Sequence, residues 1–242
     1  MKFDIPLLGD ITGLNIVHLQ CHIGTDTLSL ARRGARSVTG LDFSTASIKA
    51  AKDLASRVAG GDKLDFVTAS VYDATQHLAE GSFDLVFTGI GAICWIPSIK
   101  RWAQTVFRLL KPGGRLFIRE CHPVVWSIDE KVTDKLVIRY PYFETEAPMV
   151  FEDEGTYMPL IDKTAVSNTK TVEWNHGIGE IVTALLECGM RITCLVEHRS
   201  VPWNALPGRM VEGEDGEWRM KEGGERVPLT YTLQAVKVGF EP

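Results

Sequence analysis

Short strand-like runs alternate with helical patterns along the first half of the chain. Turn residues bound these runs, and the alternation is typical of βαβ units that build a parallel sheet. The expected strands are residues 15–20, 37–42, 64–69, 83–88 and 115–120, and the expected helices are residues 25–33, 45–58 and 97–110. The sequence therefore predicts an open α/β sheet with helices on both faces.

The regular pattern breaks between His122 and Val172, where aromatic, acidic and proline residues mix without a period. A structureless loop of that length is uncommon inside a compact domain. We therefore expect a cap, inserted after the fifth strand within a single domain of residues 1–242. It should contain short strands and pack over the carboxyl edge of the sheet.

The helical pattern resumes after His176. Apolar residues from Ile178 to Leu186 follow one helical stripe, which ends at Gly189. Two last strands are expected at 191–197 and 229–237, with residues 212–225 as an exposed excursion between them.

The composition narrows the class of partner. Of 242 residues, 45% are hydrophobic and 24% are charged, as in ordinary globular proteins. A net charge of −5 lacks the basic excess that nucleic-acid binding requires. The five cysteines are scattered without a C-x-x-C pair, which favours a reducing compartment. No leader or membrane-spanning run stands out, so we expect a cytoplasmic protein with a small-molecule partner.

The first strand, the loop after it and the next helix form a predicted nucleotide site, because backbone N–H groups converge there. Asp42 ends the second strand and is placed to accept hydrogen bonds from ribose hydroxyls; the alternative is that it only caps the next helix with Ser44. A dinucleotide site requires G-x-G-x-x-G, and HLQCHIGTDT contains only Gly24. The pattern is compatible with S-adenosylmethionine, which carries no phosphate.

Four segments resemble, in order and spacing, the motifs of class I S-adenosylmethionine-dependent methyltransferases. They are HLQCHIGTDTLSLARRGARSVTGLDFS, FVTASVYDA, FDLVFTGIGAICW and RLLKPGGRLFI. The close resemblance covers about residues 10–122. The HLQCH motif and the later EWNHGIGEIVTALLECG also resemble a bacterial subgroup of small-molecule methyltransferases. The resemblance implies a Rossmann-like seven-stranded sheet in the order 3-2-1-4-5-7-6, with only strand 7 antiparallel.

The same resemblance implies the cofactor contacts. The loop backbone should hold the methionine part, Asp42 the ribose, and Phe43 one face of the adenine. Ser70 takes the position of an adenine-binding Asp, with Asp73 as a rival, and the Val71 N–H is placed to reach a ring nitrogen. Thr88 and Gly89 should pass beneath the reactive methyl group. The residues implied for the loop are Gln20, Cys21, His22 and Gly24.

Two residues depart from the family pattern. His18 replaces the common acidic residue of the first strand, and Gln20 replaces the first loop glycine. Contacts to the cofactor's amino group must therefore differ from the usual arrangement. The alternation of His18, Gln20 and His22 also invites a metal hypothesis, but zinc needs three or four ligands with carboxylate or thiolate support, so we expect no metal.

Methyl transfer is an in-line displacement, in which the enzyme mainly orients the nucleophile and a base is optional. His122, after the fifth strand, is the first candidate base, and His176 is the second. The alternatives are that His122 only bonds the turn at Pro123 and that Asn175 caps a helix. Trp95, Trp126, Tyr142 and Trp174 are candidate acceptor contacts or core residues. The acidic residues Glu144, Glu146, Glu152, Asp153 and Glu154 suit either a cationic amine or a solvated face.

These patterns predict methyl transfer to an O or N atom of a small molecule by a monomer or homodimer, leaving S-adenosylhomocysteine as product. One alternative is a noncatalytic module that binds S-adenosylmethionine or S-adenosylhomocysteine and uses the insert for a protein partner. Another is a nucleotide-dependent oxidoreductase, against which the missing glycine pattern counts.

Overall fold

A computed structural model describes residues 2–152 and 170–239. Its centre is a seven-stranded sheet in the order β3-β2-β1-β4-β5-β11-β8. The strand β11 pairs antiparallel with both of its neighbours, and the other pairs are parallel. This is the Rossmann-like order that the resemblance implies. The strands are β1 (Asn15–Leu19), β2 (Ser37–Asp42), β3 (Leu64–Thr68), β4 (Phe83–Thr88), β5 (Leu110–Cys121), β8 (Met190–His198) and β11 (Thr230–Lys237).

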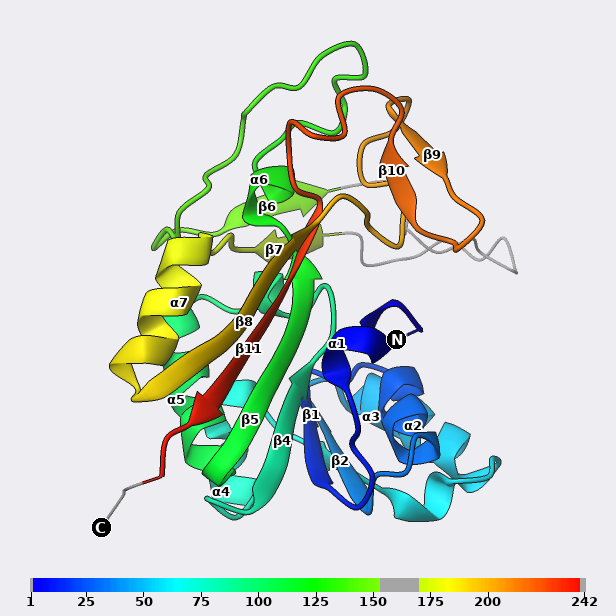
Figure 1. The fold of residues 1–242 in the computed structure, drawn as a ribbon, viewed down its shortest axis with the longest axis vertical. Coiled ribbons are helices and arrows are strands. Elements are labelled where there is room, and N and C mark those ends of the chain that lie inside the picture. The colour runs from blue at the N-terminus through cyan, green and yellow to red at the C-terminus, as the bar shows by residue number, and fades with distance from the viewer. Residues whose placement is uncertain (1, 153–169, 240–242) are drawn as a thin grey trace.

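Helices cover both faces of the sheet (Figure 1). The helices α1, α2 and α3 lie on one face, and α4, α5 and α7 lie on the other. The α-helices are α1 (Ile5–Leu8), α2 (Thr25–Arg32), α3 (Thr45–Ser56), α4 (Ala74–His77), α5 (Ile99–Leu109), α6 (Pro123–Trp126) and α7 (Ile178–Glu187). The short 3₁₀ helices are η1 (Lys2–Asp4), η2 (Gly61–Lys63), η3 (Val71–Asp73) and η4 (Ile93–Trp95).

Serine side chains begin two of the longer helices. Ser44 Oγ accepts a hydrogen bond from the Ser47 N–H at 3.2 Å at the start of α3, as the sequence predicts. At α5 the expected first residue, Pro97, lies two residues too early. The Ser98 side chain accepts from the Arg101 N–H at 3.4 Å, so the helix begins at Ile99. The helix α3 also ends two residues before the expected Val58.

Two apolar cores fix the strands. Between the sheet and helices α5 and α7, Trp102 and Tyr231 are fully buried. On the opposite face, Leu8, Ile16 and Phe117 pack in a second core. Burial of one such side chain contributes about 1.5–3 kcal/mol. The carboxyl ends of β1, β2 and β4 are therefore held on a rigid base.

The segment after β5 contains short strands, as expected for residues 122–172. The strand β6 (Met149–Glu152) pairs antiparallel with β7 (Lys170–Glu173), and both lie beyond the carboxyl ends of the central strands (Figure 1). Residues 153–169 of the insert lie outside the described residues.

The exposed excursion expected at residues 212–225 is exposed in part, but it includes a hairpin and a buried acidic residue. The strand β9 (Met210–Glu212) pairs with β10 (Trp218–Met220), and the hairpin packs on a third core that also holds Val125 and Leu229. Between these strands, Glu217 is 6% exposed and pairs with Arg119 of β5. This buried ion pair explains why an acid-rich stretch folds against the domain. Within the described residues, no helix is long and apolar enough to cross a membrane.

Candidate active site

The loop after β1 has a strained backbone at two residues that are not glycine. Gln20 has a φ of 55° and His22 a φ of 50°. Each such conformation costs on the order of 1–3 kcal/mol and persists only where the surroundings enforce it. Gly24, with a φ of 77°, needs to be glycine, because a Cβ there would lie 3.0 Å from the side chains of Ala51 and Phe66. The loop backbone thus adopts a left-handed conformation that favours glycine, although two of these positions are Gln20 and His22.

The loop is tied to neighbouring strands. Gln20 Nε2 donates to the Ala92 carbonyl at 2.6 Å, and the Cys21 N–H donates to the Leu41 carbonyl at 3.0 Å. Burial raises the pKa of the Cys21 thiol to about 12, so this cysteine is not a thiolate near neutral pH. The hydrogen bonds hold the loop backbone between the ends of β2 and β4.

Asp42 lies at the carboxyl end of β2 and is 7% exposed. Its Oδ2 accepts from the His22 N–H at 2.9 Å, and its Oδ1 accepts from the Ser44 N–H at 2.9 Å. The carboxylate therefore braces the loop and also starts the next helix. A carboxylate has about four lone-pair sites, so capacity for further hydrogen bonds remains.

The residues expected around adenine lie beside Asp42. Phe43 is 69% exposed, although it is a large apolar side chain. Ser70 Oγ accepts from the Tyr72 N–H at 3.3 Å, and Val71 is buried in η3. Asp73 accepts a hydrogen bond from Gln76 Nε2 at 3.1 Å. The two candidate polar groups thus have local partners, whereas the Phe43 ring is open to solvent.

The end of β4 brings Thr88 and Gly89 next to the first strand. Thr88 is fully buried, and its hydroxyl has no hydrogen-bond partner among the described residues. In β1, His18 Nδ1 lies 2.9 Å from Thr27 Oγ1, and burial lowers the His18 pKa to about 4. The imidazole is therefore neutral near pH 7.

Glu120 organises the segment after β4, a role that the sequence analysis missed. Its carboxylate accepts from the N–H groups of Gly91 at 2.5 Å, Ala92 at 2.9 Å and Ile93 at 3.3 Å. Burial raises the Glu120 pKa, against the effect of these hydrogen bonds. The available signal was an acidic residue at the end of the apolar run RLFIRE.

His122 is 5% exposed at the start of α6. Its Nδ1 accepts from the Val124 N–H at 3.2 Å, so Nε2 carries the proton and faces Glu197 Oε1 at 2.9 Å. Burial lowers the His122 pKa, while Glu197 opposes that shift. The ring is neutral near pH 7, and its one lone pair caps the helix.

His176 is 2% exposed and joins the insert to the segment after β4. Its Nε2 lies 3.0 Å from the Ile93 carbonyl and 2.9 Å from the Ile96 carbonyl. Its Nδ1 lies 2.8 Å from Glu144 Oε2. Two carbonyl oxygens can only accept, so Nε2 must donate, and both ring nitrogens are engaged.

The remaining candidates divide between core and surface. Trp126 packs in the third core, and Trp95 is 45% exposed. The Tyr142 hydroxyl accepts from the Ile178 N–H at 3.3 Å, and the backbone N–H of Trp174 donates to the Cys94 carbonyl at 2.8 Å. Of the acidic residues, Glu144 binds His176, Glu146 and Glu152 are exposed, and Asp153 and Glu154 lie outside the described residues.

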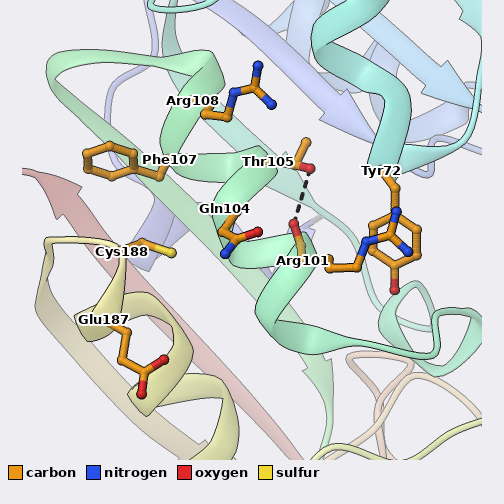
Figure 2. Close-up of a pocket in the computed structure, with 8 residues that line it drawn as sticks. All are labelled: Tyr72, Arg101, Gln104, Thr105, Phe107, Arg108, Glu187 and Cys188. Atoms are coloured by element: carbon orange, nitrogen blue, oxygen red, sulfur yellow. Dashed lines mark hydrogen bonds between the residues drawn. The ribbon is translucent and has the colours of Figure 1, made fainter.

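Two surface hollows lie away from the residues implied for the cofactor. Figure 2 shows one of about 440 Å³ between α5 and the end of α7, lined by Tyr72, five residues of α5, Glu187 and Cys188. Its charged groups already have partners, because Arg101 stacks 4.0 Å above the Tyr72 ring and Arg108 pairs with Glu80. Across residues 2–152 and 170–239, no cluster of His, Cys, Asp and Glu could hold a metal ion.

Comparison with known proteins shows what this chain resembles. Residues 17–118 match a family model described as a methyltransferase domain. The chain is 28% identical over 170 residues to demethylmenaquinone methyltransferase from Lactococcus lactis, covering 69% of this chain and 59% of that protein. It is 33% identical over 111 residues to the ubiquinone biosynthesis O-methyltransferase of Xanthomonas oryzae, covering 45% and 44%. The chain thus spans less than two thirds of either relative.

The fold agrees with solved structures along nearly the whole chain. The S-adenosylmethionine-dependent methyltransferase from Mesorhizobium loti matches with a TM-score of 0.65 and 21% identity, covering 96% of this chain and 94% of that one. The chain thus has the Rossmann-like fold of these methyltransferases, and its residues 17–118 are similar to a methyltransferase domain. Both relatives named above are methyltransferases.

Proposed function

We propose that the protein transfers a methyl group from S-adenosylmethionine to an O or N atom of a small organic molecule. The observation that carries the proposal is the geometry at Asp42. This buried carboxylate accepts one backbone hydrogen bond on each oxygen and keeps lone pairs for two neighbouring hydroxyls. A ribose presents two such hydroxyls, and the O-methyltransferase relative supports an oxygen acceptor.

Other polar atoms near Asp42 are consistent with a bound cofactor. Among the described residues, Gln20 Oε1 and Thr88 Oγ1 are buried without a hydrogen-bond partner. Unpaired buried polar atoms are costly unless a ligand or water satisfies them. Gln20 lies in the loop after β1 and Thr88 ends the neighbouring strand β4, so a polar ligand at this edge would relieve that cost.

The chain's residues would share the binding as follows. The Gln20–Gly24 backbone holds the methionine end, and Asp42 holds the ribose. Phe43 covers the adenine, with Ser70 and Val71 at its edge, while Thr88 and Gly89 lie beneath the methyl group. When bound, the cofactor supplies a methyl group already activated for displacement. The protein's task is to orient the acceptor and exclude water.

We propose that the acceptor binds next to the described part of the insert, whose strand β6 lies beyond the carboxyl ends of the central strands. His122 is the stronger candidate base, because it is neutral near pH 7 and has a lone pair on Nδ1. Release of the Val124 hydrogen bond would free that lone pair. His176 has no comparable nitrogen, since both of its ring atoms face acceptors. We therefore assign His176 to positioning the insert.

A second candidate function is a binding module without catalysis. It is favoured by Gln20, which stands where the class resemblance implies a glycine and which, like His22, has a positive φ. A nucleotide-dependent oxidoreductase is less compatible with this loop, because the glycine pattern for a pyrophosphate is missing.

Calorimetric titration with S-adenosylmethionine, S-adenosylhomocysteine and NAD(P)H separates these functions, together with mass spectrometry of any ligand released from purified protein. The proposal predicts binding of both sulfur compounds and no binding of NAD(P)H. A screen of phenols, alcohols and amines for methyl transfer then distinguishes an enzyme from a binding module. NAD(P)H binding without adenosyl binding would overturn the proposal.

A further inference from the structure

The end of β1 lacks a negative charge of its own. His18 stands where the class resemblance implies an acidic residue, and it is 3% exposed. Burial lowers its pKa to about 4, and its Nδ1 is bonded to Thr27 Oγ1. The strand end thus offers a neutral ring nitrogen, Nε2, for which no hydrogen bond is present within the described residues.

A carboxylate approaches the same place from the helix that follows. A Cβ built on Gly89 would lie 3.6 Å from His18 Nε2 and 3.8 Å from Asp26 Oδ2. The side chains of His18 in β1 and Asp26 in α2 therefore both approach Gly89, which follows β4 and has no side chain. In the part of the chain that the structure describes, no hydrogen bond or ion pair reaches the Asp26 carboxylate.

This constellation suits a cation with several N–H donors. Asp26 supplies the compensating charge, His18 Nε2 can accept a hydrogen bond, and the absent side chain of Gly89 allows close approach. An anion is disfavoured, because the Asp26 carboxylate would repel it. A primary ammonium group meets these requirements.

We infer that Asp26, together with His18 Nε2, binds the α-ammonium group at the amino-acid end of the cofactor. The negative charge missing from the first strand is thereby supplied from the first turn of α2. The inference rests on the proposed function and extends it to a residue that neither the motifs nor the comparisons assign.

The test compares two ligands by calorimetric titration of the intact chain. S-adenosylhomocysteine carries the ammonium group, whereas 5′-methylthioadenosine has the same adenosine but no amino-acid end. Asp26→Asn should weaken S-adenosylhomocysteine binding by about tenfold or more and leave methylthioadenosine binding unchanged. The matched control is Asp62→Asn, an equal charge change on an exposed residue of η2 at the opposite edge of the sheet.

Retained methylthioadenosine binding shows that the Asp26→Asn protein is folded with an intact adenosine site. Unchanged affinity for S-adenosylhomocysteine in this variant would overturn the inference while leaving the proposed function standing. An equal loss for both ligands would also overturn it, because Asp26 would then support the loop rather than the ammonium. If the unaltered protein binds neither ligand, the proposed function itself fails.

Discussion

The edge of the sheet where we propose the cofactor, called the cofactor edge below, differs in its contacts from the insert and the hairpin beyond it. At the ends of β1, β2 and β4, backbone groups make most of the hydrogen bonds, as in the His22 and Ser44 N–H groups on Asp42. The described part of the insert and the β9–β10 hairpin, together called the cap below, are held by contacts between side chains, among them Arg119 with Glu217 and His176 with Glu144. The first region can therefore tolerate side-chain replacement more readily than the second.

This difference explains how Gln20 and His22 can occupy loop positions whose positive φ favours glycine. A backbone-built site depends on φ and ψ, and the packed strands around the loop hold both residues in the left-handed region. A site built from buried ion pairs has no such freedom, because removal of one partner leaves the other charge unpaired. The cap should thus be more sensitive to single substitutions than the cofactor edge.

The largest effect is expected for His122 in the cap. Loss of a general base typically lowers turnover by about 10²–10⁴-fold. The turnover of the His122→Ala protein should therefore fall by that amount, while its affinity for the cofactor stays unchanged. Because burial lowers the His122 pKa, unaltered enzyme should lose activity only as the pH falls below the usual histidine range near 6.5. Turnover against pH, measured with an identified acceptor, checks this.

A second variant at the same site separates the base from the helix cap. His122→Asn keeps a side-chain acceptor for the Val124 N–H but has no basic nitrogen. Activity near that of the unaltered protein would assign His122 to structure alone. His77→Ala, at an exposed histidine of α4, should leave turnover unchanged.

The next effect is on stability. Arg119 is 4% exposed and donates to both Glu217 oxygens, at 3.2 and 2.8 Å. Arg119→Met leaves Glu217 buried without its guanidinium partner and should cost about 3–5 kcal/mol in the free energy of unfolding. Urea denaturation followed by circular dichroism measures it. Arg219→Ala breaks an exposed pair with Asp215 and should change little; equal losses in the two variants would contradict the comparison.

At the cofactor edge, a smaller effect is expected on the pH dependence of stability. The folded-state pKa of His18 is about 4, below the unfolded value near 6.5. The unfolded chain therefore takes up the proton first, and stability falls as the pH drops from 6.5 toward 4. Between pH 7.5 and 5, the unaltered protein should lose about 2 kcal/mol more than His18→Asn. An equal loss of unfolding free energy in the unaltered protein and in His18→Asn would show that protonation of His18 does not destabilise the fold in this pH range.

The sequence predicted the sheet well because its signals are local. Buried parallel strands read as short apolar runs, and residues such as Ser44 and Gly189 mark helix ends. The seven-strand order came from the resemblance, and the structure confirms it. Asp42 could also be placed from sequence, since its position at a strand end fixes its surroundings.

The rest depends on contacts between distant residues. The β9–β10 hairpin folds inward because Glu217 meets Arg119, a pair separated by 98 positions. Nothing in the local sequence around Glu217 distinguishes it from its exposed acidic neighbours. Likewise, the sequence does not single out Asp26, because the proposed role of this residue depends on Gly89, which is distant in the sequence and follows the end of β4.

The most direct test of the central claim is titration of S-adenosylmethionine into the Asp42→Ala protein. Loss of the charge-assisted hydrogen bonds to the ribose should weaken binding by about tenfold or more, with Asp62→Ala as the matched control. Circular dichroism establishes that the variant is folded. A clear loss confined to Asp42→Ala would support a ribose site at the end of β2. Unchanged affinity in a folded Asp42→Ala protein would contradict the account and remove the cofactor from this edge of the sheet.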